Sequence, residues 1–465
     1  MGFIIFVAII LGVIIYWLLQ NWLIILCVIG GIILISIIAE AVKQSNKPQQ
    51  PQYEYAYTAP LTGSCSCDTA PSEQPTFTSK EPQYIKKIWS TPNENVIEQK
   101  AELPGGDRME YAQECTDIMQ ALESVGVMLD LVNCTMTPSS ISYHFNLFNL
   151  AQHKKVQQNV KMIDMILEGE RKALIEDSNL AHFCITVPRH DREFVNLKTA
   201  MLLKDKNGVN QFEALRSPTT VALGIGKEPV ILDISKAPHL LIAGTTGSGK
   251  SIMLHSIIAS MLFNSTPASL AFLMVDPKRV ELSRYNGLPF MLRDVVTDKR
   301  EAIKALKAMC EVMDDRYEQM SKGVVFKSKI VVIIDELADL LLGTKGEQGM
   351  GSAEEYLIRL CQLGRACGMH VVSCTQNPLA SVVTSLIRAN MPTRIGLKVA
   401  SHVESRVIGV KGCEGLSGKG DAILSTADSA TNIRFQASYI SDSDIEKLIQ
   451  YWKSDKPLAK SVLAA

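Results

Sequence analysis

The sequence predicts an α/β fold built on a parallel sheet, with a small α+β domain ahead of it and a helical hairpin at the N-terminus. Three observations support this prediction. A glycine-rich loop at 244–251 lies between a short apolar run and a pattern of helical spacing. Another apolar run, at 330–334, ends in two acidic residues, and residues 3–39 are almost entirely apolar. The short apolar runs before the loop and at 330–334 are typical of strands buried on both faces of a parallel sheet.

The glycine-rich loop reads GTTGSGKS and has the context of a phosphate-binding loop. The run 239–243 predicts a strand before it, and apolar residues at helical spacing predict a helix after it. Glycines permit backbone angles that aim successive amides at one anion, in front of the helix N-terminus. We therefore expect Lys250 to reach the β- and γ-phosphates of ATP and Ser251 to hold Mg²⁺. The expected nucleotide-binding residues are Gly244, Thr245, Thr246, Gly247, Ser248, Gly249, Lys250 and Ser251.

The catalytic acids are expected at the end of the second apolar run, IVVIIDE at 330–336. Asp335 would hold the water shell of Mg²⁺ opposite Ser251. Glu336 would polarise the attacking water as a general base. A third apolar run, 369–375, is followed by Gln376, which we expect to sense the γ-phosphate. With Lys250, these three side chains form the predicted catalytic set.

Composition sets further bounds. A chain of 465 residues is long enough for two domains and appendages. The formal net charge of −1 gives no overall basic field, so any polyanion must bind locally or to several assembled copies. The 11 cysteines follow no repeating framework, which fits a reducing cytosol.

The N-terminal apolar stretch predicts a membrane anchor at residues 1–42. Gln20 and Asn21 divide it into two pieces of about 17 residues, the low end of the length that spans a bilayer. We expect a hairpin with its turn at these two residues and both ends in the cytoplasm; one long, tilted helix is the alternative. Lys43 and Lys47 follow, in agreement with the positive-inside rule. The expected location is the inner (cytoplasmic) membrane, in contact with the lipid bilayer, with the folded part in the cytoplasm.

The rest of the chain divides by composition into four parts. A linker rich in Pro, Gln and Ser spans 43–106, and a small α+β domain spans 107–230. The nucleotide-binding domain spans 231–455, and a tail spans 456–465. Within the small domain the expected helices are 109–131 and 156–167, and the expected strands lie in 127–132, 137–148, 183–187 and, leading into the next domain, 222–234.

From about residue 110 to Trp452 the chain resembles the FtsK/SpoIIIE family of DNA translocases. The resemblance rests on many motifs in the family's order, not on the phosphate-binding loop alone. These motifs are PHLLIAGTTGSGKS (238–251), MVDPKRVELSRYNGLP (274–289), DVVTDKREAIKAL (294–306), MDDRY (313–317), IIDELADLL (333–341), RLCQLGRACGMHVV (359–372), TQNP (375–378), SLIRANMPTRIG (385–396) and GCEGLSGKGDAIL (412–424).

The resemblance implies a RecA-like P-loop ATPase motor that assembles into a homo-hexameric ring and moves double-stranded DNA through its pore. The small α+β domain would be the family's ring-forming domain. ATP would lie between subunits, so an arginine of one subunit should stabilise the phosphoryl group held by its neighbour. The candidates are Arg365, Arg388, Arg394 and Arg406, each of which could equally be a structural ion-pair partner. Asp276 and Lys278 are open between a structural role and a contact with nucleotide or DNA.

Some features depart from the family pattern. Asn377 stands where the family usually has arginine, and the stretch between Tyr317 and Ile330 is shorter than in typical members. The chain stops soon after Trp452, without the winged-helix module of chromosomal members, and its membrane part is smaller than a four-span anchor. We expect a reduced form carried by a plasmid, phage or conjugative element. Such a form would act in segregation or conjugation with a membrane pore complex as partner.

Two other functions compete with this reading. A protein secretion ATPase would use a related motor, but such proteins usually carry tandem motors, and one phosphate-binding loop is present here. A membrane scaffold that uses nucleotide only for assembly would not need Lys250, Ser251, Asp335 and Glu336 all intact.

Overall fold

The computed structural model describes residues 108–147, 151–167, 173–177, 182–342, 351–429 and 432–454. The predicted membrane anchor (1–42), linker (43–106) and tail (456–465) lie outside the described residues. Across the described ranges, no helix combines the length and the apolar character that a membrane crossing needs.

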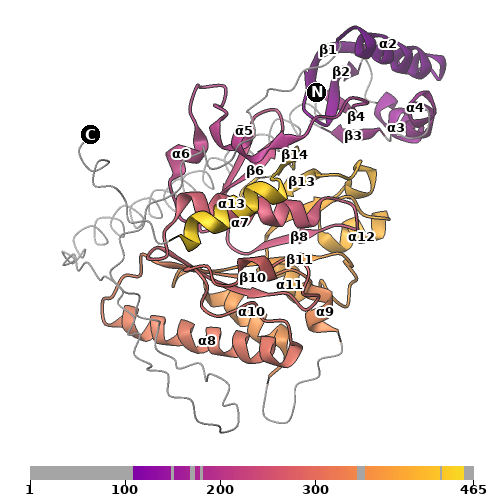
Figure 1. Ribbon diagram of the computed structural model, residues 1–465. Coiled ribbons are helices and arrows are strands. Elements are labelled where there is room, and N and C mark those ends of the chain that lie inside the picture. The colour runs from indigo at the N-terminus through magenta and orange to yellow at the C-terminus, as the bar shows by residue number, and fades with distance from the viewer. Residues whose placement is uncertain are drawn as a thin grey trace, which may run out of the picture. The chain divides into compact units, whose positions relative to one another are not determined.

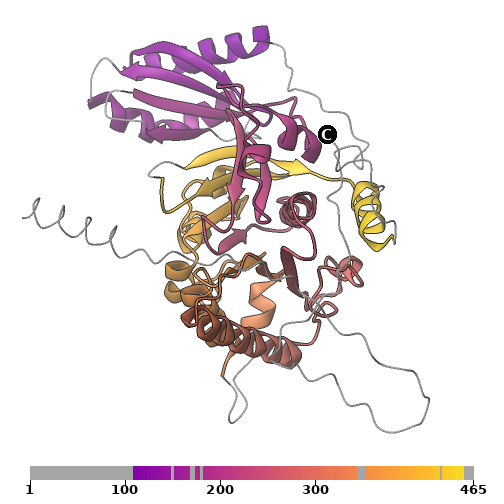
Figure 2. The same cartoon turned by 90° about the vertical axis from the view of Figure 1, so that its left-hand side faces the viewer.

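The first part of the described chain is a four-stranded antiparallel sheet with three helices. In chain order its elements are α2 (Arg108–Ser124), β1 (Leu129–Met136), β2 (Ser140–Leu147), α3 (Ala151–Gln158), α4 (Val160–Ile166), β3 (Leu174–Asp177) and β4 (His182–Pro188), and the strand order is β1-β2-β4-β3. Alternate residues of β2 (Ile141, Tyr143 and Phe145) are buried in one cluster with apolar residues of the helices. Figure 2 shows α2 lying over these strands. This part of the chain is therefore a packed layer of helices on a sheet.

Two predicted helices differ from the structure. The helix expected over 109–131 ends at Ser124, and the chain continues as β1 from Leu129. The helix expected over 156–167 is broken into α3 and α4 at Asn159, whose side-chain amide donates to the Lys155 carbonyl at 2.7 Å. Asparagine side chains compete in this way with the helical backbone.

The second part is one large mixed sheet. Its strands are β5 (Val195–Asn196), β6 (Thr220–Ile225), β7 (Pro229–Asp233), β8 (Leu240–Ala243), β9 (Leu270–Val275), β10 (Lys329–Ile334), β11 (Met369–Thr375), β12 (Thr393–Leu397), β13 (Asp421–Ser425) and β14 (Ile433–Tyr439). The order is β7-β6-β14-β13-β12-β8-β11-β10-β9, with β5 paired to β14. Strands β12, β8, β11, β10 and β9 are parallel to one another. The predicted parallel sheet is confirmed, and an antiparallel extension continues it at the β12 side.

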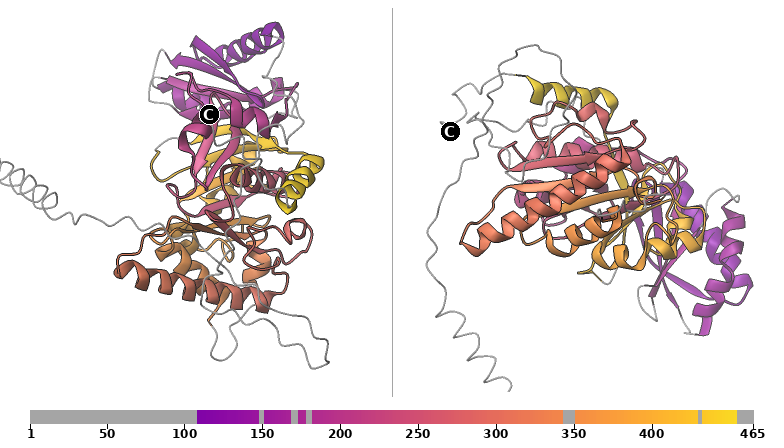
Figure 3. Two further views of the ribbon diagram at one scale, coloured as in Figure 1. Left: turned by 60° about the vertical axis from the view of Figure 1, so that its left-hand side comes forward. Right: turned by 90° about the horizontal axis from the view of Figure 1, so that it is seen from below.

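Helices cover both faces of this sheet (Figures 1 and 3). Helices α7 (Lys250–Asn264) and α13 (Asp442–Lys453) pack on one face, and α8 (Lys299–Ser321) and α10 (Ala353–Leu363) pack on the other. The remaining helical segments are α5 (Leu197–Leu202), α6 (Gln211–Leu215), η2 (Ser283–Tyr285), α9 (Leu337–Leu341), α11 (Ser385–Asn390), α12 (His402–Ile408) and η3 (Cys413–Gly415). Residues of β9 alternate between the two cores: Phe272 lies in the first and Leu273 in the second. A strand buried on both faces has this period of two, which is why its sequence is continuously apolar.

The large sheet begins earlier in the chain than the predicted domain division at residue 230. The structure has the two strands expected within 222–234, as β6 and β7, but β6 pairs with β14 of the large sheet. The division therefore falls inside a hairpin of the nucleotide-binding domain.

Candidate nucleotide site

The phosphate-binding loop connects β8 to α7 at the carboxyl edge of the parallel strands. Gly247 and Gly249 have φ angles of 78° and 103°, the left-handed region that other residues avoid. A Cβ atom at Gly249 would also lie 2.6 Å from the backbone nitrogen of Gly420. The same segment holds the loop in place, because Gly420 N donates to the Ser248 carbonyl at 2.7 Å. Position 249 therefore requires glycine both because of its positive φ angle and because a Cβ atom has no room there.

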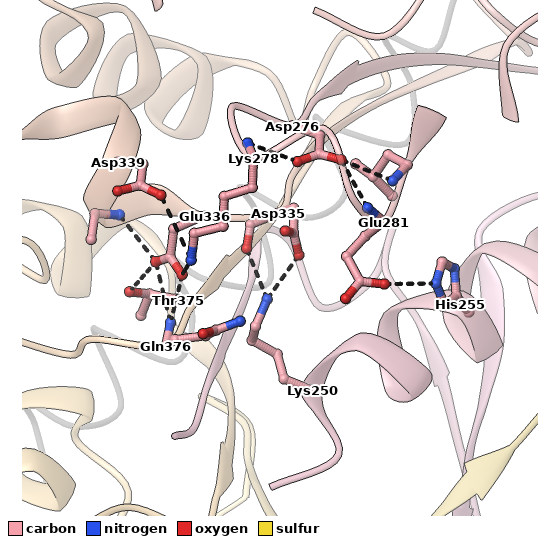
Figure 4. Close-up of polar contacts among 12 residues, drawn as sticks. Lys250, His255, Asp276, Lys278, Glu281, Asp335, Glu336, Asp339, Thr375 and Gln376 are labelled. Carbon is pink, nitrogen blue, oxygen red and sulfur yellow. Dashed lines mark hydrogen bonds and ion pairs between the residues drawn. The ribbon is translucent and has the colours of Figure 1, made fainter. Parts of the chain in front are cut away.

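Lys250 and Asp335 form a buried ion pair at the base of the loop (Figure 4). The Lys250 ammonium donates to Asp335 Oδ1 at 2.8 Å and to the Asp335 carbonyl at 3.0 Å. Burial raises the pKa of the Asp335 carboxyl, and the adjacent Lys250 ammonium opposes that shift. Lys250, which the sequence predicts will bind phosphates, is thus paired with Asp335, which it predicts will hold Mg²⁺. A bound triphosphate therefore has to compete with Asp335 for the Lys250 ammonium.

Glu336 follows β10, and donors surround its carboxylate (Figure 4). Oε1 accepts hydrogen bonds from the Thr375 hydroxyl at 2.9 Å, from Gln376 N at 3.2 Å and from Ala338 N at 3.4 Å. Oε2 accepts from Gln376 N at 3.1 Å and pairs with Lys278 Nζ at 3.1 Å. The predicted general base is therefore firmly held, with its side chain 2% exposed.

Gln376 lies between Glu336 and the phosphate-binding loop. Its backbone donates to Glu336, and its side-chain Oε1 accepts a hydrogen bond from the Thr246 hydroxyl at 3.3 Å. The structure therefore brings all four predicted catalytic residues to the same edge of the sheet. Their catalytic roles stay predictions.

The loop that follows β9 contributes two further side chains. Asp276 is fully buried, and its carboxylate accepts hydrogen bonds from the backbone nitrogens of Lys278, Arg279, Glu281 and Leu282 at 2.9 to 3.1 Å. This settles the open question about Asp276 in favour of a structural role. Lys278 contacts the site through Glu336 and lies 3.7 Å from the Asp339 carboxylate.

Glu281 is a site residue that sequence reasoning missed. Its carboxylate pairs with His255 Nε2 at 3.2 Å, and it lines the same cavity as Ser251. The hydrogen bond from His255 lowers the pKa of Glu281 to about 2, against the effect of partial burial; Ser251 contributes to the lowering. The sequence could have indicated Glu281, because the segment after β9 begins at the same edge of the parallel sheet as the phosphate-binding loop.

A cavity of about 550 Å³ opens beside the phosphate-binding loop. Its lining includes residues of the loop together with Glu281, Gln376, Phe194 and Tyr439. This volume is in the range of small-molecule sites. Its oxygen donors suit Mg²⁺, which commonly binds one or two protein oxygens together with substrate phosphates. No cluster of three or more His, Cys, Asp or Glu residues suited to a metal occurs in the described ranges, so the phosphates would have to complete such a site.

Three of the four candidate arginines form one group. Arg394 Nη2 donates to the Arg388 carbonyl at 2.6 Å, and Arg388 Nη1 donates to the Arg406 carbonyl at 3.3 Å. Arg394 is the second residue of β12 and pairs in register with Leu241, at the opposite end of the strands from the phosphate-binding loop. Arg365 is exposed and donates to the Lys236 carbonyl at 3.3 Å. The Arg394 side chain is thus held by carbonyls of its own chain, whereas Arg365 and Arg406 are exposed and Arg388 is partly exposed.

A glycine loop at a strand–helix junction, a buried lysine paired with the aspartate that follows another parallel strand of the same sheet, and a glutamate beside that aspartate together define a P-loop ATPase. The FtsK/SpoIIIE family model matches residues 202–328 and 325–380. The chain belongs to the FtsK/SpoIIIE family.

Named relatives agree with this assignment. The chain is 37% identical over 296 residues to the DNA translocase SftA of Bacillus subtilis, covering 59% of this chain and 30% of that protein. It is 33% identical over 385 residues to the DNA translocase FtsK of Clostridium acetobutylicum, covering 77% of this chain and 48% of that protein. The chain therefore spans half or less of the length of these relatives.

One solved structure, the pCW3 conjugation coupling protein TcpA in its monomer form, matches 73% of this chain and 99% of its own. The identity is 22% and the TM-score is 0.47, too low to carry a conclusion about function.

Proposed function

We propose that this protein is a membrane-anchored motor that hydrolyses ATP to move double-stranded DNA. The observation that carries the proposal is the convergence of Lys250, Asp335, Glu336 and Gln376 around one phosphate-binding loop in a chain of the FtsK/SpoIIIE family. The names of the relatives, DNA translocases, support DNA as the substrate.

In this proposal each side chain of the site has one task. The amides of 244–251 bind the phosphates, and Lys250 leaves Asp335 to pair with the β- and γ-phosphates. Ser251 and Asp335 would hold Mg²⁺, which neutralises charge on the phosphates. Glu336 accepts a proton from the attacking water, and Gln376, whose side chain is linked to Thr246, senses the γ-phosphate.

Assembly and location belong to the same proposal. A homo-hexameric ring would let a neutral monomer present six copies of its pore-facing cations to DNA phosphates. These contacts would be to the backbone and would carry little sequence information. Residues 1–42 would anchor the ring in the cytoplasmic membrane, where a pore complex for segregation or conjugation could receive the DNA.

The test is ATP hydrolysis by the full-length protein in detergent, with and without linear double-stranded DNA. We expect DNA of any sequence to stimulate hydrolysis. Glu336→Gln should reduce the rate by about 100-fold or more, the usual contribution of a general base, while nucleotide binding persists. Lys250→Ala should lose nucleotide binding itself.

Other results would favour the competing functions. Hydrolysis that ignores DNA would contradict the translocase proposal and favour a protein substrate. Nucleotide-dependent assembly without hydrolysis would favour the scaffold.

A further inference from the structure

The Glu336 carboxylate is fully occupied by its protein neighbours. A carboxylate offers about four lone-pair sites, two on each oxygen. Four donors make five contacts with it at 2.9 to 3.4 Å, because the Gln376 amide is shared between Oε1 and Oε2. A water molecule can therefore reach Glu336 only after one donor has left.

The donors differ in how readily they can leave. Those of Ala338 and Gln376 are backbone amides, fixed by β11 and the start of α9. The Thr375 hydroxyl is on a fully buried side chain and would lose its acceptor. Lys278 is different, because its side chain is long, flexible and 39% exposed.

A second acceptor is already in place for Lys278. The Asp339 carboxylate lies 3.7 Å from the Lys278 ammonium, and its side chain is 42% exposed (Figure 4). A short rotation of the Lys278 side chain can exchange one carboxylate for the other and keep the ammonium paired, while Glu336 retains its hydrogen bonds from Thr375, Gln376 and Ala338. The backbone need not move, since Asp276 fixes the loop through four amide hydrogen bonds.

We propose that Lys278 is a positioning residue that restrains Glu336 in the resting motor and moves to Asp339 when the motor is activated. The inference rests on the proposed role of Glu336 as general base. Lys278 lies at an exposed loop tip beside Arg279 and Val280, the latter 72% exposed. A partner that contacts this tip can thus reach the catalytic acid through one side chain.

The first test is Lys278→Met in the full-length protein, which keeps the length of the side chain and removes its charge. Because Glu336 is then released, the kcat of the variant measured without DNA should be at least threefold that of the wild type, and its KM should be unchanged. The ratio of DNA-stimulated to basal rates should fall toward one. Lys278→Arg should return both values toward those of the wild type. Lys322→Met is the matched control, because Lys322 is another exposed lysine paired with a carboxylate, that of Glu318 at 2.7 Å.

The second test is Asp339→Asn, which removes the acceptor that receives the lysine. DNA-stimulated hydrolysis should fall severalfold while ADP binding is unchanged. A loss of hydrolysis by Lys278→Met both with and without DNA would overturn the proposal, because Lys278 would then be assisting the reaction. Unchanged rates would overturn it as well.

The two proposals fail in distinguishable ways. If DNA does not stimulate the wild-type protein, the DNA motor is contradicted, yet the basal rate of Lys278→Met still decides the role of Lys278. If the wild type hydrolyses no ATP, a gain of hydrolysis in Lys278→Met supports the restraint. If Lys278→Met hydrolyses no ATP either, the restraint is overturned.

Discussion

Two buried histidines stand out at the scale of single residues. His239 and His370 are each 1% exposed, and their ring centroids lie 6.2 Å apart. His239 Nδ1 accepts a hydrogen bond from Val371 N at 3.2 Å. Within the described part of the chain, His239 Nε2 and both ring nitrogens of His370 have no hydrogen-bond partner. Burial, assisted by neighbouring positive groups, lowers the pKa of His239 to about 4 and that of His370 to about 3.

This pair predicts a loss of stability in mild acid. Both histidines are neutral when folded, but in the unfolded chain they bind protons below a pKa of about 6.5. Stability is therefore fully present above that value and falls as the pH drops toward the folded pKa values. Each histidine should reduce the free energy of unfolding by about 2 kcal/mol between pH 7 and pH 5.

The measurement is denaturant unfolding of the wild type and of His370→Leu at several pH values. The variant should show a shallower acid slope, since one titrating group is gone. His402→Gln, at an exposed histidine, should keep the wild-type slope. Equal slopes for His370→Leu and the wild type would contradict the prediction.

Single residues also show what the sequence could and could not predict about the site. Lys250, Asp335, Glu336 and Gln376 each follow or open an element with a clear local pattern, and the structure brings them together. Lys278 follows the apolar run of β9, which places it near this edge, but its contact with Glu336 joins residues 58 positions apart. A contact of that kind depends on which strands are neighbours, and the local sequence does not state this.

At the scale of elements, the loop after β9 and the start of α8 offer a matched comparison. Asp276 and Asp298 each accept hydrogen bonds from backbone amides, four in the loop and two at the helix N-terminus. Asp276 is fully buried, whereas Asp298 is exposed. Water can replace the carboxylate at Asp298 but not at Asp276.

We therefore expect Asp276→Ala to be the more damaging change. It should reduce the free energy of unfolding by about 3 kcal/mol, because buried amides lose a charged acceptor. Asp298→Ala should cost about 1 kcal/mol, as is usual for an N-cap. Denaturant unfolding gives both values; similar losses would mean that the loop amides find other acceptors.

The same scale shows which elements were predictable. Continuous apolar runs predicted β8, β10 and β11, and the structure has β11 over 369–375, as expected. The strands of 222–234 were predicted too, but not their membership of the large sheet. Their partner, β14, lies some two hundred residues further along the chain, so the pairing is not visible in any local window.

At the scale of the whole molecule, the proposed ring has to supply a cation to each nucleotide site. Arg388 and Arg406 belong to a group whose third member, the half-buried Arg394, lies at the end of β12 remote from the phosphate-binding loop of the same chain. The adjoining helices expose Leu386 (56%) and Val403 (64%). Exposed apolar side chains around partly free arginines suit a contact between copies of the chain.

This arrangement predicts complementation between different inactive subunits. Arg388→Ala or Arg406→Ala, whichever removes the trans cation, should reduce hydrolysis by about 1,000-fold with ATP binding retained. Mixing that variant with Lys250→Ala subunits should restore part of the activity. In a mixed ring, the phosphate-binding loop of an arginine variant can face the intact arginine of a Lys250→Ala neighbour. ATP hydrolysis as a function of mixing ratio measures this, and a rate that never exceeds those of the separate variants would contradict sites shared between subunits.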